Sequence, residues 1–299
     1  MGLEFQPVAN DFSRFVGSRA AWALGAGTRV MAIRPIRTVL AVVHEIKAAV
    51  SLCGNARSCL RLSADVILFR ALRVMHLPTE NHPRRIRLRN GRVITYRLNR
   101  GDIQSIREVL MDEVYRLPFP SHQVDVLVDL GANIGLTSLF YHRTLQVRSI
   151  IAVEPDPSNA QLVRENLADL PAVVFEAAVG PHDGTARFSN NRASNLGSLS
   201  SHPSGIEVSL MSMDSVLERV PEGAKIIVKL DIEGGEEELL QANTEWLSRV
   251  DGLIVEFHPD RVDYLELIRV LQTAGFSYIP AGSRWPGSMD AFQCAANVN

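Results

Sequence analysis

The sequence predicts an α/β protein in which a mostly parallel sheet carries helices on both faces and follows a helical extension. From residue 124 onward, short apolar runs alternate with segments of helical spacing, which is typical of parallel strands buried on both faces. Before residue 83, apolar residues recur three and four positions apart, which predicts helices. We therefore expect a basic helical N-terminal extension over residues 1–83 and a sheet domain over residues 84–299.

The N-terminal extension combines helical spacing with positive charge. Helical spacing covers residues 13–50, with an interruption at Pro35, and then about residues 56–75. The first 110 residues contain 18 Lys and Arg against 7 Asp and Glu, whereas the remaining residues contain 13 against 26. A positive segment can attract lipid headgroups or another anionic partner. Residues 13–75 are therefore a candidate for peripheral membrane contact, and packing of these helices against a neighbouring domain is the other interpretation.

The sheet domain is predicted to begin with a lead-in hairpin and helix over residues 84–120. Alternating polar and apolar residues surround Asn90-Gly91, which favours a tight hairpin turn, and residues 103–117 have helical spacing. The strands that follow are predicted at 124–130, 149–155, 172–179, 224–232, 252–258, 276–280 and 291–296. Helices are predicted at 133–145, 158–170, 236–247 and 262–274, and residues 180–212 as a hairpin or irregular loops.

Composition limits the cellular setting. No apolar run reaches the roughly 18 residues that a spanning helix needs, and the first residues lack the layout of a signal peptide. The three cysteines, Cys53, Cys59 and Cys294, are odd in number and unpatterned, which favours a reducing compartment. We expect a cytoplasmic protein, with membrane-peripheral contact left open.

A glycine pattern stands where the first strand of the sheet domain meets its helix. Asp129 precedes Gly131, Asn133 and Gly135, and these glycines permit a tight turn and close approach of the helix to a ligand. The dinucleotide fingerprint G-x-G-x-x-G is absent. The pattern fits a ligand without a pyrophosphate whose amine could use Asp129, as in S-adenosylmethionine, and an ordinary strand-to-helix turn is the alternative.

An acid at the end of the second strand indicates an adenosine ligand. Glu154 lies nineteen residues after Gly135, where a carboxylate can accept hydrogen bonds from ribose hydroxyls. The ribose hydroxyls of NAD would donate hydrogen bonds to the same carboxylate. A nicotinamide-dependent oxidoreductase therefore stays an alternative, although its phosphate-binding glycines are missing.

The motifs together resemble a known family. VDLGANIGLTSLF, AVEPDPSNAQLVRENL, AAVG at 177–180, VKLDIEGGEEELL and VEFH are similar to the FkbM-type S-adenosylmethionine-dependent methyltransferases over about residues 90–280. The resemblance implies a class I, Rossmann-like fold with a seven-stranded sheet and O-methylation of a hydroxyl on a sugar, glycan or natural product. We expect the cofactor residues to be Asp129, Gly131, Asn133, Gly135 and Glu154, with Glu176 and Ala177 near the adenine.

The family hallmark in this chain runs from Lys229 to Glu236. Lys229 and Asp231 alternate out of one strand toward the same side, and we expect them to serve function, with a buried ion pair as the alternative. The expected role of Lys229, Glu233 and Glu256 is to arrange the groups that handle the acceptor proton. Glu237 and Glu238 are expected to be helix-start acids.

Glu256 and His258 end the fifth strand, and we expect them to lie beside Asp231. His258 could act as general base with Glu256 or Asp231 orienting it, or Asp231 could take the acceptor proton directly. A divalent metal held by these groups is a further possibility that the sequence does not favour, and His258 could instead be a cap-like residue before Pro259.

Two other classes of function are weighed against methyl transfer. A binding or scaffold protein could retain this fold and act through the basic N-terminal helices, because function belongs to sites and not to folds. A nucleic-acid substrate is disfavoured because neither an Asn/Asp-Pro-Pro-Tyr segment nor an RNA-binding signature is present. The sequence therefore predicts a small-molecule or glycan acceptor.

Overall fold

The computed structural model describes residues 42–77, 81–116, 124–189, 198–199, 205–258, 262–279 and 289–294. The chain divides into two compact units, Met1–His44 and Glu45–Asn299. The helices predicted for residues 13–41 lie outside the described residues, so contact of this segment with an anionic partner stays a prediction. The second unit contains both larger sheets and the candidate site, and the boundary predicted after residue 83 lies within it. Across the described ranges, every helix is too short or too polar to span a bilayer.

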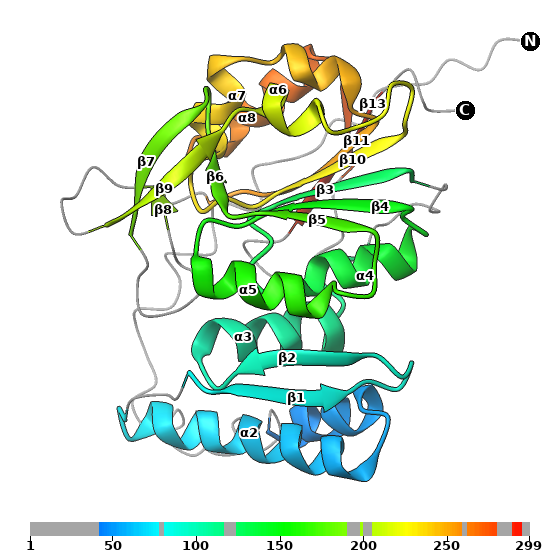
Figure 1. The fold of residues 1–299 in the computed structure, drawn as a ribbon, viewed down its shortest axis with the longest axis vertical. Coiled ribbons are helices and arrows are strands. Elements are labelled where there is room, and N and C mark those ends of the chain that lie inside the picture. Colours follow the sequence, from blue (N-terminus) through cyan, green and yellow to red (C-terminus); the bar gives the residue numbers. More distant parts are fainter. Residues whose placement is uncertain are drawn as a thin grey trace, which may run out of the picture. The chain divides into compact units, whose positions relative to one another are not determined.

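The main sheet has seven strands in the order β12–β13–β11–β10–β3–β4–β5 (Figure 1). Strand β13 is antiparallel to both of its neighbours, and all other adjacent pairs are parallel. This arrangement confirms the predicted mostly parallel seven-stranded sheet. The strands are β3 (Val126–Leu130), β4 (Ser149–Val153), β5 (Ala172–Phe175), β10 (Ile226–Leu230), β11 (Gly252–Glu256), β12 (Phe276–Ile279) and β13 (Met289–Cys294).

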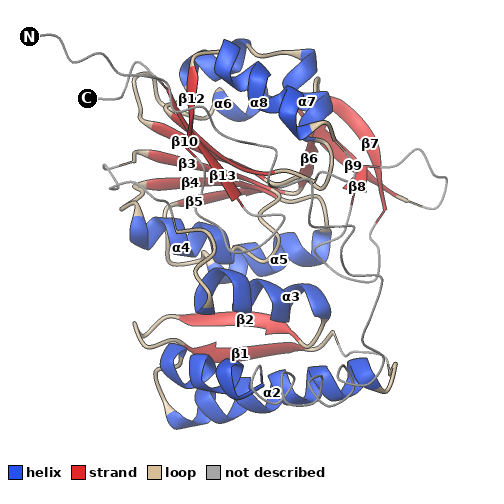
Figure 2. Ribbon diagram, turned by 180° about the vertical axis from the view of Figure 1, so that it is seen from behind, coloured by secondary structure: helices blue, strands red, loops and turns tan. Residues whose placement is uncertain are grey.

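Helices cover both faces of the main sheet, and each face has its own apolar core (Figures 1 and 2). Successive residues of β3 point to opposite faces, so Leu127 joins one core while Val126 and Val128 join the other. One face carries α4 (Leu136–Thr144) and α5 (Pro157–Asn166), and the other carries α6 (Met213–Leu217), α7 (Glu236–Ala242), the 3₁₀ helix Glu245–Arg249 and α8 (Tyr264–Thr273).

The single strand predicted over residues 172–179 is wrong, because the chain changes sheets at Glu176. Strand β5 pairs with β4 only as far as Phe175, opposite Val153, where β4 ends. Strand β6 (Ala177–Val179) instead pairs with β9 (Ile206–Met211) in a second sheet of order β6–β9–β7–β8. The other members are β7 (Gly184–Ser189) and β8 (Ser198–Leu199). Strand β7 is antiparallel to both β8 and β9, so the hairpin predicted in residues 180–212 is present as β7–β8.

The lead-in segment lies between α2 and α5. Helix α2 (Ala56–Val74) contacts β1 (Pro83–Arg87), and β2 (Val93–Arg97) contacts α5. The predicted hairpin is confirmed, and Gly91 has the positive φ of 87° that its turn requires. The predicted helix over 103–117 differs from the structure, in which α3 (Arg100–Ser105) continues as the π-helix η3 (Ile106–Met111). Such wide turns occur frequently at functional sites.

Candidate functional site

A cavity lies at the carboxyl ends of β3, β4, β10 and β11, where ligands bind in open α/β sheets. The lead-in segment contributes Ser105, Glu108 and Tyr115 to its wall. The predicted site residues on the wall are Gly131, Asn133, Glu154, Ala177, Lys229, Asp231, Glu233 and Glu256. Asp129, Gly135, Glu176 and His258 do not line the described wall.

The loop after β3 depends on glycine. Gly131 has φ +74°, and a Cβ at this position would lie 1.9 Å from the backbone oxygen of Asp231. Gly135 has φ +80°, and its Cβ would meet Val163 of α5 at 3.4 Å. The first glycine lets the loop lie against the end of β10, and the second lets the start of α4 pack on α5. The conformation of Gly131 confirms the tight turn expected from the sequence, whereas the approach of α4 to a ligand at Gly135 stays a prediction.

Glu154 is a buried carboxylate on the cavity wall, with 4% of its surface exposed. Its Oε2 accepts a hydrogen bond from the backbone N–H of Asn133 at 2.8 Å, and its Oε1 accepts from Asp156 N at 2.9 Å and Asn159 Nδ2 at 3.4 Å. Burial raises the pKa of Glu154 to about 8, and these hydrogen bonds oppose that rise only in part. Further donors from a ligand would stabilise the charged form.

Asn133 offers a buried acceptor beside Glu154. Its Nδ2 donates to Ser105 Oγ at 2.8 Å, whereas its buried Oδ1 has no hydrogen-bond partner among the described residues. Buried polar atoms are almost always paired, so an orphaned oxygen on a cavity wall indicates a place for a donor of a ligand or a water molecule.

Lys229 and Asp129 form a buried ion pair behind the loop. They lie opposite each other on adjacent strands, with Lys229 Nζ 3.3 Å from Asp129 Oδ1 and 3.2 Å from Asp231 Oδ2. Burial lowers the pKa of Lys229, but the charges of Asp231 and Asp129 together raise it by more than burial lowers it, so the net shift is upward. The ammonium group also donates to the Gly131 carbonyl at 2.7 Å. Lys229 therefore fixes the loop, and binding of a cofactor amine by the enclosed Asp129 stays a prediction.

Three carboxylates surround His258. Its Nδ1 lies 3.2 Å from Glu236 Oε1, and its Nε2 lies 3.4 Å from Glu233 Oε2 and 3.9 Å from Asp231 Oδ1. Burial lowers the pKa of His258, but Glu236, Asp231 and Glu233 together raise it to about 9. The imidazole is consequently protonated at neutral pH, and it can hold the carboxylates of Asp231 and Glu233 in place. The expected grouping of Asp231 with His258 is present.

Glu256 lies on the cavity wall next to Tyr115 of the lead-in segment. Tyr115 donates a hydrogen bond from its hydroxyl to Glu256 Oε2 at 3.2 Å. Burial, followed by repulsion from Asp231, raises the pKa of Glu256 above its ordinary value. Residues from β10, β11 and the lead-in segment therefore meet around one polar part of the cavity.

Comparison with known proteins identifies the family. The model of the Methyltransferase FkbM domain matches residues 129–278, which include the loop after β3, Glu154 and the Lys229–Glu236 segment. The chain belongs to the FkbM methyltransferase family. Its main sheet is accordingly that of a class I methyltransferase.

Two curated relatives resemble this FkbM-family chain at low identity. Methyltransferase 1 of Beauveria bassiana is 22% identical over 222 residues, which cover 64% of this chain and 88% of the relative. Hexuronic acid methyltransferase AglP of Haloferax volcanii is 27% identical over 189 residues, which cover 60% and 77%. Among solved structures, methyltransferase FkbM from Methylobacillus flagellatus KT has a TM-score of 0.42 and 15% identity, and the match covers 86% of this chain and 60% of that one.

Several wall and contact residues of this FkbM-family chain had no site role predicted from the sequence. Glu236 is fully buried, accepts hydrogen bonds from Ile232 N at 3.0 Å and Gly234 N at 2.9 Å, and orients His258. Its position directly after two glycines was the available signal. Glu108 reaches the cavity from η3 and Tyr115 from the turn after it, and nothing in the local sequence pattern marks either residue.

The two residues predicted to lie near the adenine, Glu176 and Ala177, differ in position. Glu176 is exposed between β5 and β6, where its Oε2 accepts from Arg164 at 3.2 Å, whereas the neighbouring Ala177 is buried and lines the cavity.

Potential metal-ligand atoms of Asp231, Glu233 and His258 lie within 4.8 Å of one another. A divalent metal held by these three side chains therefore stays an open alternative.

Proposed function

We propose that this FkbM-family protein uses S-adenosylmethionine to methylate a hydroxyl group of a sugar, glycan or related natural product. One observation carries the proposal. The acids at the ends of β10 and β11, Asp231 and Glu256, line the same cavity as Asn133 and Glu154, which have the features of an adenosine site. The groups proposed to handle the proton and the groups proposed to bind the cofactor therefore share one cavity.

The residues present fit the cofactor. The buried Oδ1 of Asn133 can accept a hydrogen bond from a ligand, and the Glu154 carboxylate can accept from ribose hydroxyls. Gly131 leaves the loop backbone open to the ligand, and Ala177 supplies a small apolar surface on the wall. When bound, S-adenosylmethionine supplies an electrophilic methyl group.

The acceptor hydroxyl is a weak nucleophile that gains from losing its proton during transfer. Asp231 is the wall carboxylate whose two oxygens face Lys229 and His258, so its orientation is fixed from both sides. His258 carries its own proton at neutral pH and does not line the described wall, which favours an orienting role for it. In this proposal Asp231 accepts the hydroxyl proton, and Glu256, Glu233 and Lys229 position the reacting groups.

The sugar class of acceptor rests on different support. One curated relative is named as a hexuronic acid methyltransferase, at 27% identity. Carboxylates and a phenol on the cavity wall, contributed by Glu108, Glu256 and Tyr115, can bind several hydroxyl groups at once.

The test is calorimetric titration of the full chain with S-adenosylhomocysteine and, separately, with NADH. We expect binding of S-adenosylhomocysteine alone, weakened by Glu154→Ala and unchanged by Glu222→Ala, which removes an exposed acid before the amino end of β10 that does not line the cavity. A screen of sugar hydroxyls with labelled S-adenosylmethionine then identifies the acceptor. Binding of neither ligand by a folded sample would favour the scaffold alternative, and binding of NADH would favour an oxidoreductase.

A further inference from the structure

We infer that Arg97, in the lead-in hairpin, is a positioning residue for Glu154 and therefore for the ribose of the cofactor. The inference rests on the proposed function, because it assigns Glu154 the ribose hydroxyls. It adds that the hairpin, which precedes the family match at residue 129, is part of the cofactor site.

Asp102 holds one edge of the Arg97 guanidinium in place. Asp102 is fully buried, and its two oxygens accept from Arg97 Nε and Nη2, each at 2.9 Å, while Oδ2 also accepts from Arg97 N at 2.7 Å. Asn99 caps the start of α3 and accepts from Asp102 N at 2.8 Å. This bidentate geometry allows the planar guanidinium little freedom to turn.

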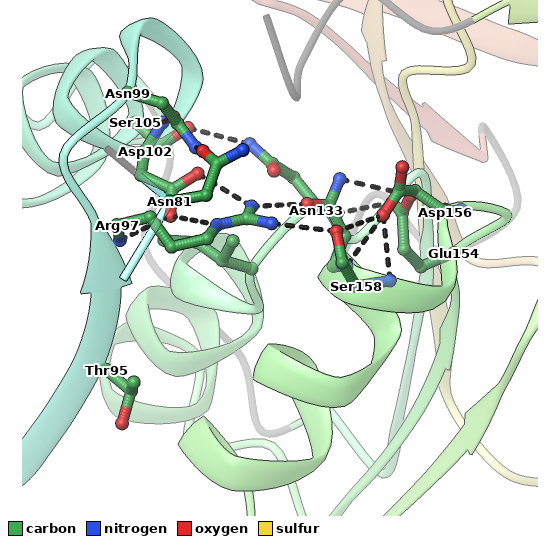
Figure 3. A network of polar contacts seen from close by, with 12 residues as sticks. Asn81, Thr95, Arg97, Asn99, Asp102, Ser105, Asn133, Glu154, Asp156 and Ser158 are labelled. Carbon is green, nitrogen blue, oxygen red and sulfur yellow. Dashed lines mark hydrogen bonds and ion pairs between the residues drawn. The ribbon is translucent and has the colours of Figure 1, made fainter. Parts of the chain in front are cut away.

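The other side of the guanidinium reaches the start of α5 (Figure 3). Nη1 donates to Ser158 Oγ at 2.8 Å, and Nη2 donates to Asn159 Oδ1 at 2.5 Å. Asn159 Nδ2 in turn lies 3.4 Å from Glu154 Oε1. Arg97 and Glu154 are thereby joined through the single side chain of Asn159.

A second route joins the same two residues. Ser158 Oγ donates to Asp156 Oδ1 at 2.6 Å, and Asp156 N donates to Glu154 Oε1 at 2.9 Å. Asp156 Oδ1 also caps α5 by accepting from Ser158 N and Asn159 N. Both routes end on the same carboxylate oxygen, so a shift of the guanidinium would move the partners of Oε1 together.

Helix capping does not explain an arginine in this place. A cation at a helix N-terminus opposes the helix dipole, and burying a guanidinium is costly unless its partners are in good geometry. Arg97 is 6% exposed, and the cap itself is supplied by Asp156. What Arg97 adds is a fixed orientation for Asn159 and Ser158.

The lead-in segment also holds the opposite oxygen of Glu154. Ser105 of α3 accepts from Asn133 Nδ2, and Asn133 N donates to Glu154 Oε2 (Figure 3). The segment β2–α3 therefore contacts the network on both sides of the carboxylate. Glu154 has its partners in place before a ligand arrives.

The test compares two ligands in three proteins. S-adenosylhomocysteine and its 2′-deoxy analogue are titrated into the wild type, Arg97→Met and Arg84→Met. Arg84 lies on the paired strand of the same hairpin, where it forms an ion pair at 2.7 Å with Asp65 of α2, on the side of the hairpin away from α5. It is therefore a matched control for loss of a partly buried arginine.

We expect Arg97→Met to weaken S-adenosylhomocysteine binding by about tenfold, the equivalent of roughly one well-placed hydrogen bond. The wild-type preference for the ribose over the 2′-deoxyribose ligand should shrink toward one in Arg97→Met and persist in Arg84→Met. Loss of general stability would not change this ratio. Arg97→Lys keeps the positive charge but lacks the planar guanidinium. It should therefore recover only part of the wild-type preference for the ribose ligand.

The double variant Arg97→Met/Glu154→Ala should bind as Glu154→Ala does, because the effect of Arg97 passes through Glu154. If Arg97→Met does not fold, Asn159→Ala removes the connecting side chain and should reduce the same ratio. A wild-type ratio in a folded Arg97→Met or Asn159→Ala protein would overturn the inference while leaving the proposed function intact. Failure of the wild type to bind S-adenosylhomocysteine would overturn both.

Discussion

The backbone oxygen of Asp231 lies directly against Gly131, so that a Cβ at Gly131 would be 1.9 Å from it. The loop after β3 and the end of β10 therefore meet backbone to backbone. Lys229 reinforces this contact, because it donates to the Gly131 carbonyl and pairs with the Asp231 carboxylate. The proposed cofactor side and the proposed proton-handling side of the cavity are joined at this point.

Gly131→Ala should destabilise the protein well beyond the cost of its positive φ. The added Cβ must displace backbone, whereas at Gly91 the φ is also positive, at +87°, and nothing lies within 4 Å. Gly91→Ala therefore measures the conformational cost alone, roughly 1–2 kcal/mol. Urea unfolding of both variants tests the difference. Equal losses of unfolding free energy would show that the contact with Asp231 can relax.

The stability of the ligand-free protein should fall as the pH rises toward about 8 in a way that depends on Glu154. Burial raises its pKa from 4.5 to about 8, so the folded state binds a proton more tightly than the unfolded state. Its contribution is fully present below about pH 4.5 and is lost as the pH rises through about 8. Glu154→Gln cannot ionise, and its melting temperature should fall less than that of the wild type between pH 6 and 9. An identical pH slope in the two proteins would contradict the raised pKa.

Asp231→Asn should retain affinity for S-adenosylhomocysteine but lose turnover by about 10²–10⁴-fold, the contribution of a positioned proton acceptor. Asparagine keeps an oxygen that can face Lys229, so the loop contact survives. Glu238→Gln is the matched control, since it removes an exposed acid from the first turn of α7. Unchanged turnover in Asp231→Asn would exclude its proposed role.

Chelation should leave turnover unchanged. Asp231 already pairs with Lys229, and Glu233 with His258, so the proposed proton transfer to Asp231 uses no ion. The measurement is activity after dialysis against EDTA, with and without added Mg²⁺ or Mn²⁺. Activity that disappears and returns with either ion would instead assign a metal to these three side chains.

Much of the fold could be predicted because strand and helix patterns are local. The apolar run of β3, the helical spacing of α5 and the Asn90-Gly91 turn each carry their signal within a few residues. The split between β5 and β6 could not be predicted in this way. It depends on where the neighbouring β4 ends, and the segment 172–179 itself is continuously apolar except for Glu176.

The candidate site shows the same division. Sequence spacing placed Gly131, Asn133 and Glu154 at strand ends, and the structure puts all three on one cavity wall. Spacing could not show that Asp129 is enclosed with Lys229, because β3 and β10 lie side by side although one hundred residues separate the two partners.

The sequence by itself determined the order of the elements, the glycine turn and the acids that end successive strands, because each depends on residues close together in the chain. The tertiary structure alone decided which of these charges face the cavity and which are satisfied by partners. It turned Lys229 toward Gly131, Glu236 toward His258, and Arg97 toward the start of α5. The physical reason is that a buried charge requires a partner, and that partner comes from whichever segment the fold brings near.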